Sequence, residues 1–252
     1  MADTATAPAP ARMRGDGLRL FARGLGQLLI TLGLVILLFV VYELWGTSVY
    51  TRAQQNKLTK SIEHIWKGSA PDITTVNVKE VPLGSGIAVL RIPRFGRSYH
   101  MVVVEGTGYD DLTKGPGHYP GTALPGQVGN FAVAGHRTTY LAPFNKIDTL
   151  RRGDAIVLET KSKWLVYRIH DIPAGHGYPH VPWREIVDPT DVKVAYAVPD
   201  QSDPNQHPSL RLLTFTSCNP KYSAAQRYVV HAELQLVQPK TAGAPAALLE
   251  KS

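Results

Sequence analysis

A long apolar run near the N-terminus limits what this chain can fold into more than any other feature. Residues 25–45 carry no charged side chain other than Glu43. About 20 residues at ~1.5 Å per residue match the ~30 Å hydrocarbon core of a bilayer. A surface helix of a soluble domain would need a polar stripe, which Gln27 and Thr31 alone do not make. The run predicts a transmembrane helix.

The flanks of this run predict an uncleaved anchor with a cytoplasmic N-terminus. No small-residue cleavage pattern ends the run, where Tyr42, Glu43 and Trp45 stand instead. Basic residues precede the span, and cationic flanks remain on the cytoplasmic side of a membrane. The four arginines in question are Arg12, Arg14, Arg19 and Arg23. We therefore expect a disordered cytoplasmic tail over residues 1–24 and a single-pass anchor in the cell membrane.

Everything after the anchor is then expected outside the cell. Residues 46–80 are polar and mixed, and they predict mainly an extracellular stalk, with residues 53–66 compatible with a short helix. The tail, residues 240–252, is rich in Ala and Pro and predicts disorder.

Between these segments, residues 81–239 show the pattern of a β protein. Short apolar or alternating runs are mostly bounded by Gly, Pro, Asp or Asn, and no helical period extends over a dozen residues. Such spacing indicates one all-β domain, either a closed barrel or a sandwich. The runs are residues 87–92, 100–106, 129–136, 155–160, 163–172, 209–218 and 226–237.

The charge of the chain suits several partners and selects none of them. The formal net charge is +7 and the pI is about 9.5, which is compatible with nucleic acid, anionic lipid or an anionic cell wall. The basic residues are spread along the chain rather than gathered in one run. A nucleic-acid partner would require cytoplasmic exposure, and the expected topology argues against it.

Cys218 is the only cysteine, so an intramolecular disulfide is impossible. A lone cysteine is ordinarily a buried packing residue, but Cys218 ends a predicted strand beside the turn signal Asn219-Pro220. A reactive thiol needs exposure and a positive neighbour. Arg227 opens the next predicted strand, and an antiparallel pair joined by residues 219–226 would bring it back beside Cys218.

His136 ends another predicted strand, directly after Gly135. The chain has nine histidines, so one histidine by itself is weak evidence of function. The sequence contains no H-x-H, H-E-x-x-H or C-x-x-C pattern and no glycine-rich phosphate loop after a strand. It therefore predicts no metal site and no cofactor.

Residues 117–160 and the later run TFTSCNPKYSAAQRYVVHAEL resemble sortases, the transpeptidases of Gram-positive cell surfaces. Three motifs occur in the order typical of that family: a histidine after a strand, a cysteine ending a strand and an arginine opening the next. The family motif Thr-Leu-x-Thr-Cys corresponds here to residues 214–218, where Phe215 replaces Leu and Ser217 keeps a hydroxyl. The context AGHRTTY is most similar to class E sortases of actinobacteria. The resemblance implies a closed sortase-type barrel of about eight strands with short helices.

The resemblance also implies a mechanism. The Cys218 thiolate attacks the Thr–Gly carbonyl of a C-terminal LAxTG- or LPxTG-like sorting signal on a surface protein and forms a thioacyl enzyme. His136 is the general acid and base, and Arg227 donates hydrogen bonds to the oxyanion or the substrate backbone. An amine on a peptidoglycan precursor of the lipid II type then resolves the intermediate.

The resemblance assigns substrate contacts as well. Tyr119 lies in a region that lines the signal groove in relatives, although a core tyrosine is an equal alternative. Thr216 and Ser217 precede the nucleophile and are expected to contact substrate. The long stretch 171–208, rich in Pro and His, corresponds to a variable loop that sets specificity. Its His176 is interpreted as an ordinary loop residue.

Two other functions stay open on sequence grounds. An L,D-transpeptidase is also an envelope cysteine enzyme, but that family expects Ser-x-Gly-Cys and an arginine two residues after the cysteine, where this chain has Pro220. The other is a non-catalytic anchored binding module in which Cys218 is simply buried.

Overall fold

The computed structural model describes residues 16–175, 177–201, 203 and 206–250, and the chain divides into two compact units, Met1–Trp45 and Gly46–Ser252. The first unit contains α1 (Asp16–Val41), and a π-helical turn, η1 (Tyr42–Gly46), follows it. The stretch Gly17–Val41 is long and apolar enough to cross a bilayer. The helix therefore begins earlier than the apolar run predicts, so Arg19 and Arg23 lie inside it. Arg12 and Arg14 lie outside the described residues.

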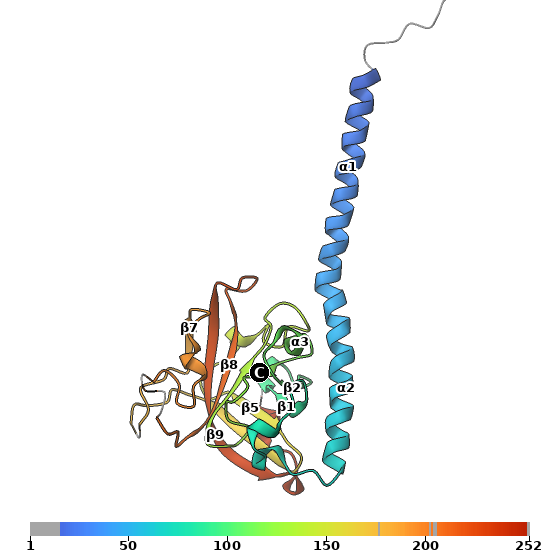
Figure 1. Cartoon of the computed structure of the whole chain (residues 1–252). Coiled ribbons are helices and arrows are strands. Elements are labelled where there is room, and N and C mark those ends of the chain that lie inside the picture. The colour runs from blue at the N-terminus through green and yellow to red at the C-terminus, as the bar shows by residue number, and fades with distance from the viewer. Residues whose placement is uncertain (1–15, 176, 202, 204–205, 251–252) are drawn as a thin grey trace, which may run out of the picture. The chain divides into compact units, whose positions relative to one another are not determined.

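The second unit is a β-barrel with short helical segments (Figure 1). Its strands are β1 (Gly86–Arg91), β2 (Met101–Glu105), β3 (Gly117–His118), β4 (Gly129–Ala134), β5 (Ala155–Glu159), β6 (Lys163–Ile169), β7 (Arg184–Val187), β8 (Arg211–Asn219) and β9 (Gln226–Pro239). Its α-helices are α2 (Thr47–Lys67) and α3 (Tyr109–Leu112). Its 3₁₀ turns are η2 (Ile73–Thr75), η3 (Val78–Glu80), η4 (Pro93–Phe95), η5 (Ile147–Thr149), η6 (Val192–Ala195), η7 (Lys240–Ala242) and η8 (Ala246–Leu249).

The 14-residue strand β9 closes the barrel. Its first half pairs with β8, and its second half pairs with β6, so the order β6-β5-β1-β2-β3-β4-β8-β9 returns to β6. Eight strands thus form a closed ring, and β7 adds to β9 on the side opposite β8. A closed ring leaves few unpaired edges. The expectation of a closed all-β barrel of about eight strands is confirmed.

Alternation along β9 places its apolar face in the barrel interior, as the sequence predicts. Tyr228, Val230 and Ala232 belong to the main core cluster, and Leu234 packs against it. The opposite face is not uniformly exposed, because His231 is fully buried there. Segment 171–208 folds over this part of the sheet and contributes β7 to it.

The sequence pattern does not predict two of the strands, β3 and β7. β3 is only two residues long, Gly117–His118, and both residues pair with β2 on one side and with β4 on the other. β7 is a four-residue edge strand in which alternate residues are exposed, so it carries no continuous apolar run. Neither segment is long enough to show a period of two.

The prediction that residues 46–80 form mainly a stalk is wrong for the part that forms α2. Instead of a linker, Thr47–Lys67 forms α2 and packs on β1 and β2 of the barrel (Figure 1). Gln55 makes this contact specific. Its side-chain amide donates to the carbonyls of Val102 (3.0 Å) and Lys114 (2.8 Å), and its Oε1 accepts from the Val102 amide at 2.7 Å. The side chain therefore pairs with β2 as a neighbouring strand would.

The tail predicted to be disordered also packs on the barrel as far as Glu250. Ala247 is buried in a small cluster with Ala155, Val157 and Val166. Arg168 donates from Nη1 to Glu250 at 2.6 Å, which ties the end of the described chain to β6. Small alanines fit against the outside of β5 and β6, which a composition argument for disorder does not detect.

Gln55→Leu should destabilise the barrel by about 2–3 kcal/mol, because it leaves buried backbone groups of β2 unpaired. Asn56→Leu, at the exposed neighbouring position, should change stability by only about 0.5 kcal/mol. Thermal melts of the full chain in detergent measure both. Equal melting temperatures for the two variants would show that α2 is a dispensable stalk after all.

Candidate active site

Parallel pairing of β4 and β8 brings His136 and Cys218 to one end of the barrel. Ala134 is in register with Thr216, and each candidate residue follows its paired residue by two positions. Because the two strands are parallel, the residue just after β4 and the residue near the end of β8 reach the same edge of the sheet.

Antiparallel pairing on the other edge of β8 adds the third residue. Cys218 lies directly opposite Arg227 in the register of β8 and β9. The predicted return of Arg227 to the cysteine is therefore confirmed. The Arg227 guanidinium donates from Nη1 to the carbonyls of Ala224 (3.1 Å) and Gln226 (3.0 Å), and no carboxylate pairs with it in the part of the chain that the structure describes.

These side chains line a groove with a volume of about 370 Å³. All six residues that the sequence analysis proposes for the site lie along it: Tyr119, His136, Thr216, Ser217, Cys218 and Arg227. Thr107, Leu112, Ala134, Gly135 and Pro189 complete the lining. Cys218 is partly exposed, as a nucleophile must be, rather than buried as a packing residue.

His136 is half-buried, and the chain directly before it is closely packed. A Cβ added at Gly135 would lie 2.6 Å from the Phe144 ring, so only glycine lets the chain pass beneath that ring. Burial lowers the pKa of His136, which favours a neutral imidazole. Its Nε2 is buried and has no hydrogen-bond partner among the described residues. The Tyr140 ring lies 5.0 Å from the imidazole, centroid to centroid.

The side-chain hydroxyl groups of the three predicted substrate contacts already form hydrogen bonds within the protein. The Tyr119 hydroxyl and Thr216 Oγ1 are hydrogen-bonded to each other at 2.8 Å across the groove floor. Ser217 donates its hydroxyl proton to the carbonyl of Gly135 at 2.8 Å and is 3% exposed. The Ser217 hydroxyl therefore joins the ends of β4 and β8.

Arg137 is a site residue that the sequence analysis did not single out. It is 4% exposed, and its Nη1 donates to the Cys218 carbonyl (3.2 Å) and to Asn219 Oδ1 (3.0 Å). Its Nη2 forms an ion pair with Asp148 at 3.1 Å. The only signal in the sequence is its place immediately after His136, and an arginine at the end of a strand ordinarily reads as a solvated residue.

The described residues of segment 171–208 pack on one another beside the groove. Isolated bridges join Ile172 to Val181 and Gly175 to Tyr178, and a small apolar cluster including Val198 lies beneath them. Pro189 is the residue of this segment that reaches the groove wall. His176 lies outside the described residues.

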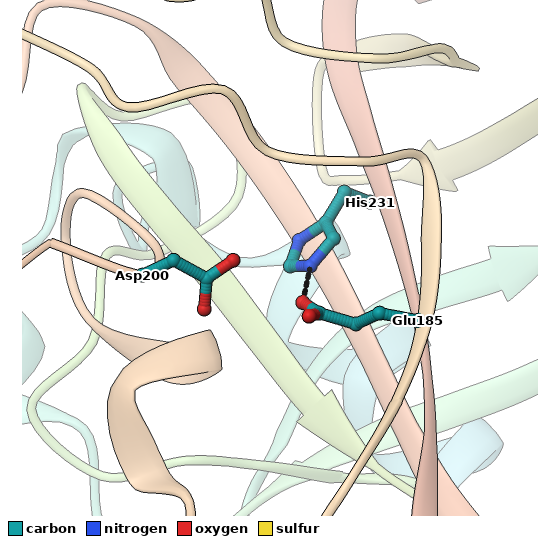
Figure 2. Close-up of side chains that lie close together, drawn as sticks. All are labelled: Glu185, Asp200 and His231. Atoms are coloured by element: carbon teal, nitrogen blue, oxygen red, sulfur yellow. Dashed lines mark hydrogen bonds and ion pairs between the residues drawn. The ribbon is translucent and has the colours of Figure 1, made fainter.

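Glu185, Asp200 and His231 are the described residues that could together hold a metal ion, although the sequence predicts no such site (Figure 2). One donor atom of each lies within 4.8 Å of the others. Both His231 ring nitrogens are already hydrogen-bonded, Nδ1 to Thr214 (2.9 Å) and Nε2 to Glu185 (3.0 Å). Burial and the charge of Glu185 raise the pKa of Asp200 to about 6. Hydrogen bonds therefore already occupy both ring nitrogens of His231, and the cluster joins β7 to β9 away from the Cys218 and Arg227 pair.

Comparison with known proteins identifies the barrel. The protein-family model for the "Sortase domain" matches residues 90–235, more than half of the chain. This chain belongs to the sortase family. The matched segment contains all six groove residues discussed above. Sortases are transpeptidases, so the family supplies the general reaction class.

Relatives of known sequence include class E sortases. The chain is 34% identical to "Sortase SrtE1" of Streptomyces coelicolor over 95% of this chain, and it covers 64% of that protein's length. It is 33% identical to "Sortase SrtE2" of the same organism over 83% of this chain and 80% of that one.

Solved structures agree with this family. The sortase SrtF from Corynebacterium diphtheriae is similar with a TM-score of 0.62 and 38% identity, over 69% of this chain and 98% of that one. Sortase E from Streptomyces avermitilis is similar with a TM-score of 0.54 and 41% identity, over 66% and 99%. These structures confirm the sortase fold of the barrel, and class E sortases are among its relatives.

Proposed function

We propose that this sortase is a membrane-anchored cysteine transpeptidase with Cys218 as nucleophile, His136 as general acid and base, and Arg227 as oxyanion or substrate-backbone donor. The convergence of the three side chains on one groove supports the proposal, because β4, β8 and β9 deliver them to the same end of the barrel. The partial exposure of Cys218 argues against a binding module that merely buries its cysteine.

The acylation half of the reaction uses the neutral state of His136. Neutral His136 accepts the thiol proton of Cys218, and the thiolate attacks the Thr–Gly carbonyl of the sorting signal. Arg227 donates to the oxyanion that develops, and its charge is not neutralised by a described carboxylate. The C–N bond then breaks, His136 returns the proton to the departing amine, and a thioester remains on Cys218.

The second half transfers the bound protein to an acceptor. An amine of a peptidoglycan precursor attacks the thioester carbonyl and loses its proton to His136. The C–S bond breaks and the Cys218 thiolate leaves, so the proton now on His136 restores the starting thiol. Atoms and charges balance over the cycle without a cofactor.

Both substrates lie outside the cytoplasm, which fits an anchored enzyme. We assign α1 as the anchor, with the N-terminus cytoplasmic and the barrel outside. Protease digestion of intact cells stripped of their wall should then remove the barrel domain. Protection of the barrel in those cells would contradict this orientation.

The class E relatives lead us to propose alanine rather than proline at the second signal position. Turnover of Leu-Ala-x-Thr-Gly peptides should exceed that of Leu-Pro-x-Thr-Gly peptides by about tenfold, since one pocket contact is typically worth 1–3 kcal/mol. Cleavage rates of the two peptide sets by the full chain measure this. Equal or faster turnover of the proline peptides would overturn the assignment.

Substitutions at the three residues test the roles directly. Cys218→Ala and Cys218→Ser should abolish thioacyl formation, because an alkoxide forms far less readily than a thiolate near neutral pH. His136→Ala should lose about 10²–10⁴-fold in rate. Arg227→Ala should lose about 10²–10³-fold, and Arg227→Lys should recover little of it, since a point charge lacks the guanidinium fork. Peptide cleavage reports each change.

A thermal melt of each variant is the control, because the three side chains line an open groove and should not hold the fold together. Near-native turnover of Arg227→Ala would remove it from the mechanism. Loss of activity in His136→Ala that tracks only with melting would do the same for His136.

A further inference from the structure

A buried arginine lies immediately behind the proposed nucleophile, and the mechanism above does not use it. Arg137 does not line the groove, and it is 4% exposed. Burying a charged side chain is costly unless hydrogen bonds and charge pairing compensate. The contacts of Arg137 show which interactions compensate for its burial.

The first set of contacts links the two strand ends that carry His136 and Cys218. Nη1 of Arg137 donates to the main-chain carbonyl of Cys218 at 3.2 Å and to the Asn219 side chain at 3.0 Å. Arg137 directly follows His136 in the chain. One side chain therefore fixes the nucleophile's backbone relative to the backbone of the general base.

A second set of contacts fixes Arg137 itself. Its guanidinium carbon lies 5.3 Å from the centroid of the buried Tyr228 ring, next to Arg227 in β9. The Asn145 side chain donates to the Arg137 carbonyl at 3.0 Å, and Lys221 donates to Asn145 at 3.1 Å. The loop after β4, the end of β8 and the start of β9 thus meet at this one side chain.

The charge of Arg137 is only partly neutralised. Its ion-pair partner is Asp148, whose side chain is 50% exposed and therefore well screened by water. Its Nε is buried without a hydrogen-bond partner among the described residues. Besides Cys218, the charged or titratable residues that line the groove or surround Arg137 and its partner Asn145 are Tyr119, His136, Arg137, Asp148, Lys221, Arg227 and Tyr228. Asp148 is the only carboxylate among these described residues.

We propose that Arg137 is a positioning residue for transpeptidation, which holds the ends of β4 and β8 so that His136 and Cys218 meet at a fixed separation and which leaves a buried positive charge behind the thiol. The inference rests on the proposed roles of His136 and Cys218. It adds a residue outside the groove, and it assigns that residue an effect on rate rather than on substrate binding.

Three variants of the full chain in detergent separate this role from simple packing. Arg137→Met removes the charge and the fork but keeps the length of the side chain. Arg137→Lys keeps the charge but cannot reproduce the forked hydrogen bonds. Asp148→Asn is the matched control, since it removes the ion pair and leaves Arg137 in place.

Peptide cleavage and cysteine alkylation distinguish the three variants, and a thermal melt of each variant is the control. In peptide cleavage, Arg137→Met should lose about 10²-fold in kcat with KM within about threefold, since misplaced reacting groups slow chemistry rather than binding. Arg137→Lys should lose about tenfold, and Asp148→Asn should stay within about threefold. Iodoacetamide alkylation across pH reports on Cys218 alone, because it is the only cysteine. The alkylation rate at neutral pH should fall about tenfold in Arg137→Met and should stay within about threefold of native in the other two, because only Arg137→Met removes the positive charge.

A folded Arg137→Met variant with near-native kcat, or one whose alkylation profile matches the native profile, would overturn the proposal. If Arg137→Met does not fold, Arg137→Lys decides, and native kcat in that variant would overturn it as well. If the proposed function itself were wrong, the native chain would cleave no sorting peptide. The alkylation profiles of Arg137→Met and Asp148→Asn would still test the effect of Arg137 on Cys218.

Discussion

β8 pairs in parallel with β4 on one edge and antiparallel with β9 on the other, and the whole groove depends on those two ladders. The parallel ladder sets His136 level with Cys218, and the antiparallel ladder sets Arg227 opposite it. Because hydrogen-bond register is discrete, a slip of one residue in either ladder would turn a side chain to the other face of the sheet. Backbone pairing alone therefore brings the three residues to the same end of the barrel.

The barrel in turn supports this pairing. β9 can serve as a partner for β8 only because its second half closes on β6, and that closure buries the interior cluster around Phe131, Phe215 and Tyr167. The shortness of β3 explains why α2 is part of the folded unit. β3 pairs only with Val104 and Glu105 of β2, and Gln55 of α2 pairs with the backbone of Val102 instead. An apolar helix alone would leave those groups unpaired.

Side-chain bonds then tighten the strand ends. Ser217 donates to the Gly135 carbonyl, and Arg137 donates to the Cys218 carbonyl, so the two strands are tied on both sides of the reacting residues. Gly135 is needed at the same place because the Phe144 ring leaves no room for a Cβ. The result is a rigid groove floor in which the buried Nε2 of His136 is one polar atom left without a described partner. A substrate or the Cys218 thiol can supply that partner.

The apolar span and the seven main strands were predictable from local patterns, namely a run with one charged residue and short apolar or alternating runs between turn residues. Cys218 stands beside a turn signal, but His136 and Arg227 were identified through the order of three motifs that resembles sortases. The remaining features depend on the tertiary structure. The role of Gln55, the packing of Ala247 and the burial of Arg137 depend on partners that are 47 to 92 residues away in the chain, which local patterns do not encode. The strands β3 and β7 belong with them, because segments of two and four residues become strands only when a longer neighbour offers its hydrogen bonds.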